Sequence, residues 1–106
     1  MVDPIITPLV LGALAVFAAS AIEEIARLSV SWILTYFRNV AARRAYDRDS
    51  IDASVEVALR GGGKGYRVVR VVNGSVVEGT TVRPRSIDPQ VAAQHRTAQV
   101  VRWLAN

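Results

Sequence analysis

Residues 5–22 read IITPLVLGALAVFAASAI, a run of eighteen positions without a charged side chain in a chain of 106 residues. An α-helix of this length extends about 27 Å, close to the hydrocarbon thickness of a bilayer. The run therefore predicts a membrane-spanning helix. Two alternatives are a buried helix of an oligomer and a cleaved signal peptide ending near Ala19-Ser20-Ala21. The signal peptide fits less well, because Asp3 is the only charge before the run and signal peptides begin with basic residues.

Charged residues are distributed unevenly on the two sides of this run. One acid, Asp3, precedes it, and five arginines follow it: Arg27, Arg38, Arg43, Arg44 and Arg48. Because excess arginine near a span favours the cytoplasmic side, the C-terminal part is predicted to lie on that side of a membrane, or inside a membrane-containing particle. The absence of cysteine agrees with a reducing compartment.

Small residues recur within the same run. Gly12, Ala15 and Ala19 stand at i, i+3 and i+7, which places them along one stripe of a helix. Small side chains let two helix backbones approach closely. The stripe predicts a helix–helix interface, and hence a homo-oligomer or a larger protein assembly.

The following segment, residues 23–46, has two interpretations. Apolar residues at spacings of three and four, among them Ile25, Trp32 and Tyr36, predict an amphipathic continuation of the helix. Alternation around Leu28 to Tyr36 also fits a strand, but the absence of Gly and Pro from residues 13–60 favours the helix. Trp32, Tyr36 and Phe37 are predicted either to lie at a lipid headgroup layer or to pack against protein.

From Ile51 onward the apolar period changes to two, which is typical of strands. Asn73-Gly74 separates two valine-rich strands and predicts a hairpin with a type I′ turn. Asp88-Pro89 predicts the start of a helix that continues to about Leu104. The predicted fold class is α+β: a long N-terminal transmembrane and amphipathic helix in residues 1–48, followed by a small antiparallel β-β-β-α domain in residues 49–106.

No motif in the chain points to catalysis. The loop Gly61-Gly62-Gly63-Lys64-Gly65 lacks the Ser or Thr after lysine and the following helix of a phosphate-binding loop. His95 is the only histidine and there is no cysteine, so no metal site is predicted. We expect neither an enzyme nor a cofactor.

Basic residues dominate residues 60–85, where a single acid, Glu78, accompanies six of them: Arg60, Lys64, Arg67, Arg70, Arg83 and Arg85. Such a surface attracts anions, either lipid headgroups or an acidic protein. Nucleic acid is the less favoured partner, with Tyr66 beside Arg67 as a lone stacking ring.

Together these features predict a single-pass membrane-anchored structural or assembly subunit. It would self-associate through its helix and dock partners through the small basic domain. The alternative is a membrane tether whose basic domain binds nucleic acid.

Overall fold

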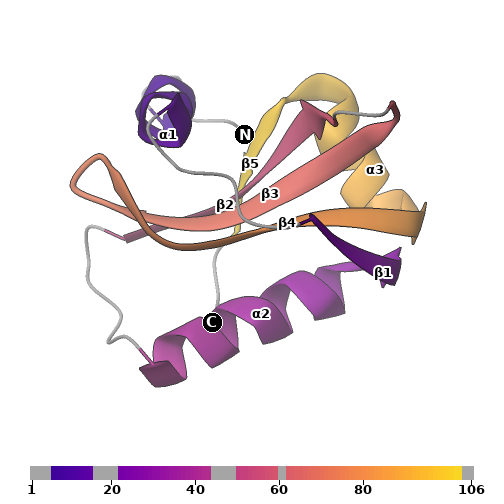
Figure 1. The fold of residues 1–106 in the computed structure, drawn as a ribbon, viewed down its shortest axis with the longest axis horizontal. Coiled ribbons are helices and arrows are strands. Elements are labelled where there is room, and N and C mark those ends of the chain that lie inside the picture. The colour runs from indigo at the N-terminus through magenta and orange to yellow at the C-terminus, as the bar shows by residue number, and fades with distance from the viewer. Residues whose placement is uncertain (1–5, 16–21, 44–49, 60–61, 104–106) are drawn as a thin grey trace.

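The computed structural model describes residues 6–15, 22–43, 50–59 and 62–103. The elements in chain order are α1 (Ile6–Ala15), β1 (Ile22–Leu28), α2 (Val30–Arg43), β2 (Ser50–Ala58), β3 (Lys64–Val72), β4 (Ser75–Ile87), α3 (Pro89–Thr97) and β5 (Val100–Arg102). The strands form one sheet in the order β1-β4-β3-β2-β5. β1 runs parallel to β4, and the other neighbours are antiparallel. α1 lies on one side of the sheet and α2 on the other (Figure 1).

The β3–β4 hairpin turns at Asn73-Gly74, as the sequence predicts. The φ angles of Asn73 and Gly74 are 52° and 78°, and Val72 pairs with Ser75. Positive φ at both central positions is the requirement of a type I′ turn. The predicted hairpin is confirmed.

Alternation along β2 and β3 separates the core into two layers. One side of the sheet packs beneath α1, where Val10, Ala13 and Leu14 meet Ala53, Val55, Val69, Val71 and Val100. The opposite side packs against α2 and α3 through Leu28, Ile33, Phe37, Tyr66, Val68, Val82 and Val91. β3 therefore contributes buried valines to both layers, as a central strand does.

The predicted membrane-spanning helix is wrong. α1 ends at Ala15, and Ile22 already belongs to a strand. Among the described residues, no helix is long and apolar enough to cross a membrane. The membrane localisation, with its cytoplasmic orientation, rested on that span and is corrected with it. The apolar residues of α1 contribute to the core of the domain, because Val10, Ala13 and Leu14 are buried against the sheet.

The predicted amphipathic continuation through residues 23–46 is also wrong as one helix. Its first part is β1, which pairs with β4 from Ile22↔Thr81 to Leu28↔Ile87. Its second part is α2, whose start is marked by Ser29: the Oγ of Ser29 accepts a hydrogen bond from the Trp32 backbone N–H at 3.0 Å. A serine in this position is a typical N-cap, and the pairing of β1 with β4 overrides the helical pattern before it.

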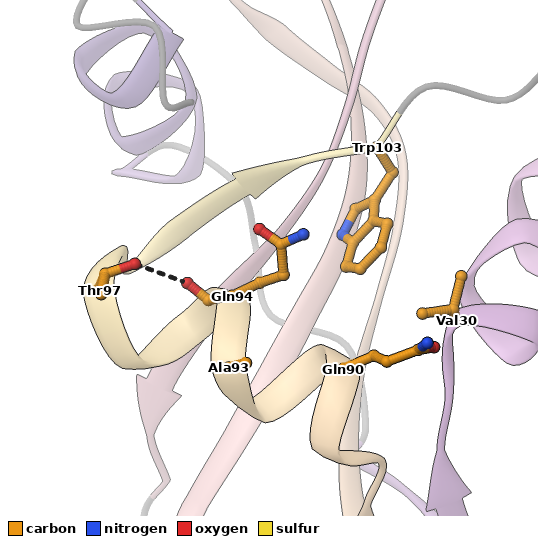
Figure 2. A pocket seen from close by; sticks show the side chains of 6 residues that line it. All are labelled: Val30, Gln90, Ala93, Gln94, Thr97 and Trp103. Carbon is orange, nitrogen blue, oxygen red and sulfur yellow. Dashed lines mark hydrogen bonds between the residues drawn. The ribbon is translucent and has the colours of Figure 1, made fainter.

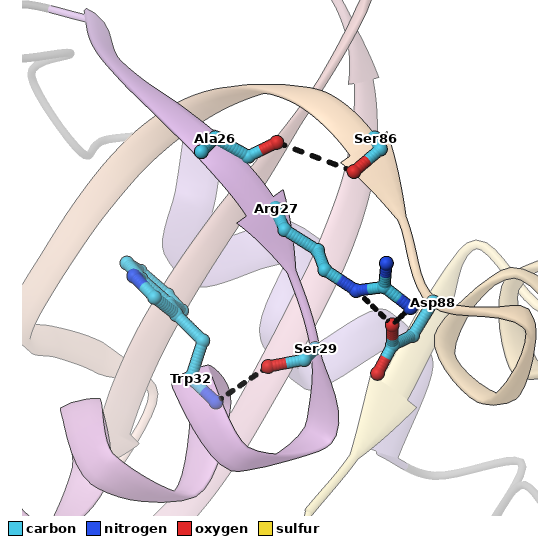
Figure 3. Close-up of polar contacts among 6 residues, drawn as sticks. All are labelled: Ala26, Arg27, Ser29, Trp32, Ser86 and Asp88. Atoms are coloured by element: carbon cyan, nitrogen blue, oxygen red, sulfur yellow. Dashed lines mark hydrogen bonds and ion pairs between the residues drawn. The ribbon is translucent and has the colours of Figure 1, made fainter.

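Polar contacts hold β1 where β4 meets α3 (Figure 3). The backbone N–H of Asp88 donates to the Leu28 carbonyl at 2.9 Å, and the guanidinium of Arg27 pairs with the Asp88 carboxylate. The hydroxyl of Ser86 donates to the Ala26 carbonyl at 3.3 Å. α3 begins at Pro89 as predicted, but it ends at Thr97, and β5 replaces the rest of the expected helix.

Candidate interaction surface

The outer face of α1 is apolar and open. Val10, Ala13 and Leu14 point into the core, whereas Pro8, Leu9, Leu11 and Gly12 are exposed. Leu9 and Leu11 keep 44% and 36% of their surface accessible. Among the described residues the only other large exposed hydrophobic side chain is Ile22, at 38%.

Gly12, predicted as part of a helix–helix interface, lies on this open face. A Cβ placed on Gly12 would meet nothing within 4 Å, so no other described part of the molecule covers it. Ala15 is the last residue of α1, but its side chain, like the whole of Ala19, lies outside the described part of the structure. The described part of this open face is therefore formed by Pro8, Leu9, Leu11 and Gly12.

The three predicted interfacial aromatics lie on α2 and pack within the protein. Phe37 is 1% exposed and belongs to the core. Trp32 and Tyr36 lie half-buried beside it, with stacked rings whose centroids are 5.8 Å apart, and Tyr36 contacts Phe37 edge to face at 5.4 Å. Such aromatic pairs stabilise the packing of a helix on a sheet.

The basic residues predicted to contact anions divide between the two faces of the sheet, except for Arg60, which lies outside the described residues. Arg70 is only 2% exposed and binds Asp52 in a two-pronged ion pair, with Nε–Oδ1 and Nη2–Oδ2 distances of 2.6 and 2.9 Å. Lys64 is exposed and lies 3.4 Å from Glu56. Arg70 therefore contributes to the interior of the fold, and part of the charge of Lys64 is balanced by Glu56.

The remaining three arginines lie on the opposite side. Arg67 on β3 pairs with Thr81 on β4, and this pair is directly adjacent to the Tyr66↔Val82 pair. Since Val82 faces α2 and α3 and side chains alternate along a strand, Arg67, Arg83 and Arg85 share the α1 side. Tyr66, the expected stacking ring, faces the other way and is 2% exposed.

A hydrogen-bonded network that the sequence did not predict lies under α3. The Nε2 of His95 is 2.7 Å from Ser54 Oγ, and its Nδ1 is 3.1 Å from the Ala98 carbonyl. Because a carbonyl only accepts, Nδ1 carries the proton and Nε2 accepts from the serine hydroxyl. The indole N–H of Trp103 donates to the same Ser54 oxygen at 2.8 Å.

Tyr66, on β3, connects this network to Glu56 on β2. Its ring lies 5.0 Å from that of His95, and its hydroxyl donates to Glu56 at 2.9 Å. Burial, together with the hydrogen bond to Glu56 and the charge of that carboxylate, raises the pKa of Tyr66 to about 12. Burial also lowers the pKa of His95, against the opposing effect of its backbone hydrogen bond to Ala98. His95 is therefore neutral in the folded protein near pH 7.

A serine oxygen beside a neutral histidine is the arrangement of an activated nucleophile, but this pair is enclosed. Ser54 is 0% exposed, and the Trp103 indole occupies its oxygen. A substrate would have to displace Trp103 before reaching Ser54. The geometry makes the network a connection between β2, β5 and α3, which is a structural role.

A shallow pocket of about 490 Å³ opens between α3 and the start of α2 (Figure 2). Its lining is formed by Val30, Gln90, Ala93, Gln94, Thr97 and Trp103. None of these side chains titrates near neutral pH, so the pocket offers amide hydrogen bonds and one indole ring but no acid or base. Within the described ranges, no three histidine, aspartate or glutamate side chains are grouped to hold a metal ion.

The sequence did not reveal the roles of Asp52, Ser54 and Glu56, because polar residues that alternate with apolar ones indicate a strand with a single buried face. One signal was present: Val68, Val69, Val71 and Val72 make β3 apolar on both faces, which predicts cover on both sides. No family model, curated protein or solved structure matches this chain.

Proposed function

We propose that this protein is an interaction module that associates with a second copy of itself through the outer face of α1. The observation that carries the proposal is the exposure of Leu9 and Leu11, at 44% and 36%, beside the open backbone of Gly12. Exposed apolar side chains gathered on one element mark interaction sites more often than scattered ones do.

Charge favours a second copy as the occupant. The protein carries a formal net charge of +4, whereas α1, ITPLVLGALA, carries no charge at all. Two basic molecules approach most easily through a neutral element, because α1 itself then adds no like-charge repulsion at the contact. A strongly charged partner would find nothing on this helix to pair with. Gly12 also allows two helix backbones to come close.

The size of the face sets the expected affinity. α1 has ten residues, of which one side is already used by the sheet, so a pair of such faces buries less than a standard protein interface. We expect a reversible dimer with a dissociation constant between about 10 and 100 μM. Pairing would bring two copies of the basic residues Arg83 and Arg85 into one particle, which suits an assembly subunit.

Sedimentation equilibrium of the full chain tests the proposal with two variants of equal charge. Gly12→Glu places a carboxylate on the open face of α1, where the free protein has room for it but a dimer must bury it. Thr35→Glu places the same group on an exposed position of α2. We expect Gly12→Glu to raise the dissociation constant by at least about tenfold and Thr35→Glu to leave it unchanged.

Two results would contradict the proposal. One is a wild-type protein that stays monomeric at about 1 mM, well above the expected dissociation constant. The other is an equal response of both variants, which would show that net charge, and not the face of α1, controls association. Circular dichroism of each variant verifies that the fold is retained.

A further inference from the structure

Two buried polar atoms on the α1 side of the sheet have no hydrogen-bond partner. They are the Nε of Arg67 and the Oγ1 of Thr81. The two residues are direct neighbours across β3 and β4, and Thr81 is 2% exposed.

Such a pair needs an explanation, because nearly all buried polar groups in folded proteins are hydrogen-bonded. Arg67 Nε is a donor only, and the Thr81 hydroxyl can donate as well as accept. The two groups have not bonded to each other. Arg67 is only partly buried, so an oxygen-rich anion that approaches along its side chain on this face of the sheet would accept from both atoms, and this single ligand would satisfy them.

Positive charge surrounds the same position. Arg83 follows Thr81 by two residues on the same face of β4, and Arg85 follows by four, so each successive arginine lies about 7 Å further along the strand. Among the described residues, no acidic side chain forms an ion pair with Arg67, Arg83 or Arg85. Glu24 is the paired neighbour of Arg83 on β1, and it is exposed to solvent.

We infer that Arg67 and Thr81, with Arg83 beside them, form a binding site for a phosphate dianion, free or as a monoester. Guanidinium groups bind phosphate through charge-assisted, directional hydrogen bonds, and the Thr81 hydroxyl adds a neutral donor. A phosphodiester chain carries one charge per phosphate, and among the described residues Tyr66, the expected stacking ring, lies on the other side of the sheet. The site goes beyond the proposed pairing through α1 and does not depend on it.

Titration of the full chain with inorganic phosphate, followed through the Arg67 Nε–H signal in ¹H–¹⁵N spectra, tests the site. Arg67→Lys keeps the charge but removes the Nε donor. Thr81→Val keeps the volume and removes the hydroxyl, so it also retains the fold. Lys64→Gln, on the opposite face, is the matched control. We expect each of the first two variants to weaken phosphate binding by about tenfold and the control to bind within about twofold of wild type.

Two further titrations distinguish the sources of phosphate. O-phosphoserine should bind as well as inorganic phosphate, and a short single-stranded oligonucleotide should bind no better per phosphate. The inference is overturned if phosphate leaves the Arg67 signal in place at about 20 mM, a concentration far above that of a built anion site. It is equally overturned if Lys64→Gln weakens binding as much as Arg67→Lys, or if only the oligonucleotide binds and Thr81→Val has no effect.

Discussion

Replacing Arg70 by methionine should destabilise the fold by about 3–5 kcal/mol, because it leaves a buried carboxylate without its cation. Arg70 and Asp52 are 2% and 3% exposed, and two hydrogen bonds of 2.6 and 2.9 Å join them. Water cannot replace the lost guanidinium at such burial. A domain of this size is stable by about 5–15 kcal/mol, so the single variant would lose a large part of its stability.

The double variant Asp52→Leu/Arg70→Met provides the sharper comparison. Removing both charges eliminates the desolvation cost together with the attraction, and such replacements are often neutral or stabilising. We therefore expect the double variant to regain most of the stability that Arg70→Met loses. Lys64→Met removes a largely exposed charge that lies 3.4 Å from Glu56, and it should change stability by no more than about 0.5 kcal/mol.

Urea unfolding followed by tryptophan fluorescence measures these three variants, together with the single variant Asp52→Leu, against wild type. A loss below about 1 kcal/mol in Arg70→Met would place Arg70 at the surface, where ion pairs contribute little, and would refute the buried pair. A double variant as unstable as the sum of the two single changes would refute the coupling between Arg70 and Asp52. In either case the sequence-based prediction that Arg70 contacts anions at the surface would be open again.

Three further changes test other parts of the fold in the same urea assay. Burial lowers the pKa of His95 below 6.5, so as the pH falls the imidazole is protonated in the unfolded chain before it is protonated in the folded one. The free energy of unfolding should therefore be at its full value above about pH 6.5 and decrease below it, and the decrease should be smaller in His95→Gln. Ser54→Ala removes the oxygen that joins His95 to Trp103 and should cost about 1–3 kcal/mol; an unchanged midpoint would argue against the network. Gly74→Val should cost more than about 1 kcal/mol because φ is +78° at this position, and no change would exclude the type I′ turn.

The parts of the fold that could be predicted from sequence depend on local chemistry. Asn73-Gly74 specifies its turn within two residues, since both adopt positive φ. Asp88-Pro89 starts α3 because proline is tolerated only in the first helical turn, and Pro89 is the first residue of that helix. The alternation of residues 51–57 indicates a strand without any knowledge of its partner.

The parts that failed depend on partners distant in sequence. Ile22 to Leu28 become a strand because β4, about sixty residues later, offers its edge in parallel register, and no local pattern reports that edge. The environment of the charged residues also depends on distant partners. Arginine is a residue type usually found at the surface, but Arg70 has Asp52 directly opposite it on β2. Pairing across strands, and not the residue type, decides whether such an arginine meets solvent or a carboxylate.

The apolar run of residues 5–22 illustrates how the ambiguity could be resolved from sequence. Length and absence of charge describe a membrane helix and a helix that covers a sheet equally well. The burial of both faces of the sheet distinguishes these two kinds of helix. Val68 and Val69 are adjacent in β3 and both 0% exposed, so each face of this strand needs an apolar cover. α2 and α3 cover the Val68 side, and the cover of the Val69 side is α1. A central strand that is valine-rich on both faces therefore makes a second apolar layer necessary, and among the described helices α1 supplies that layer.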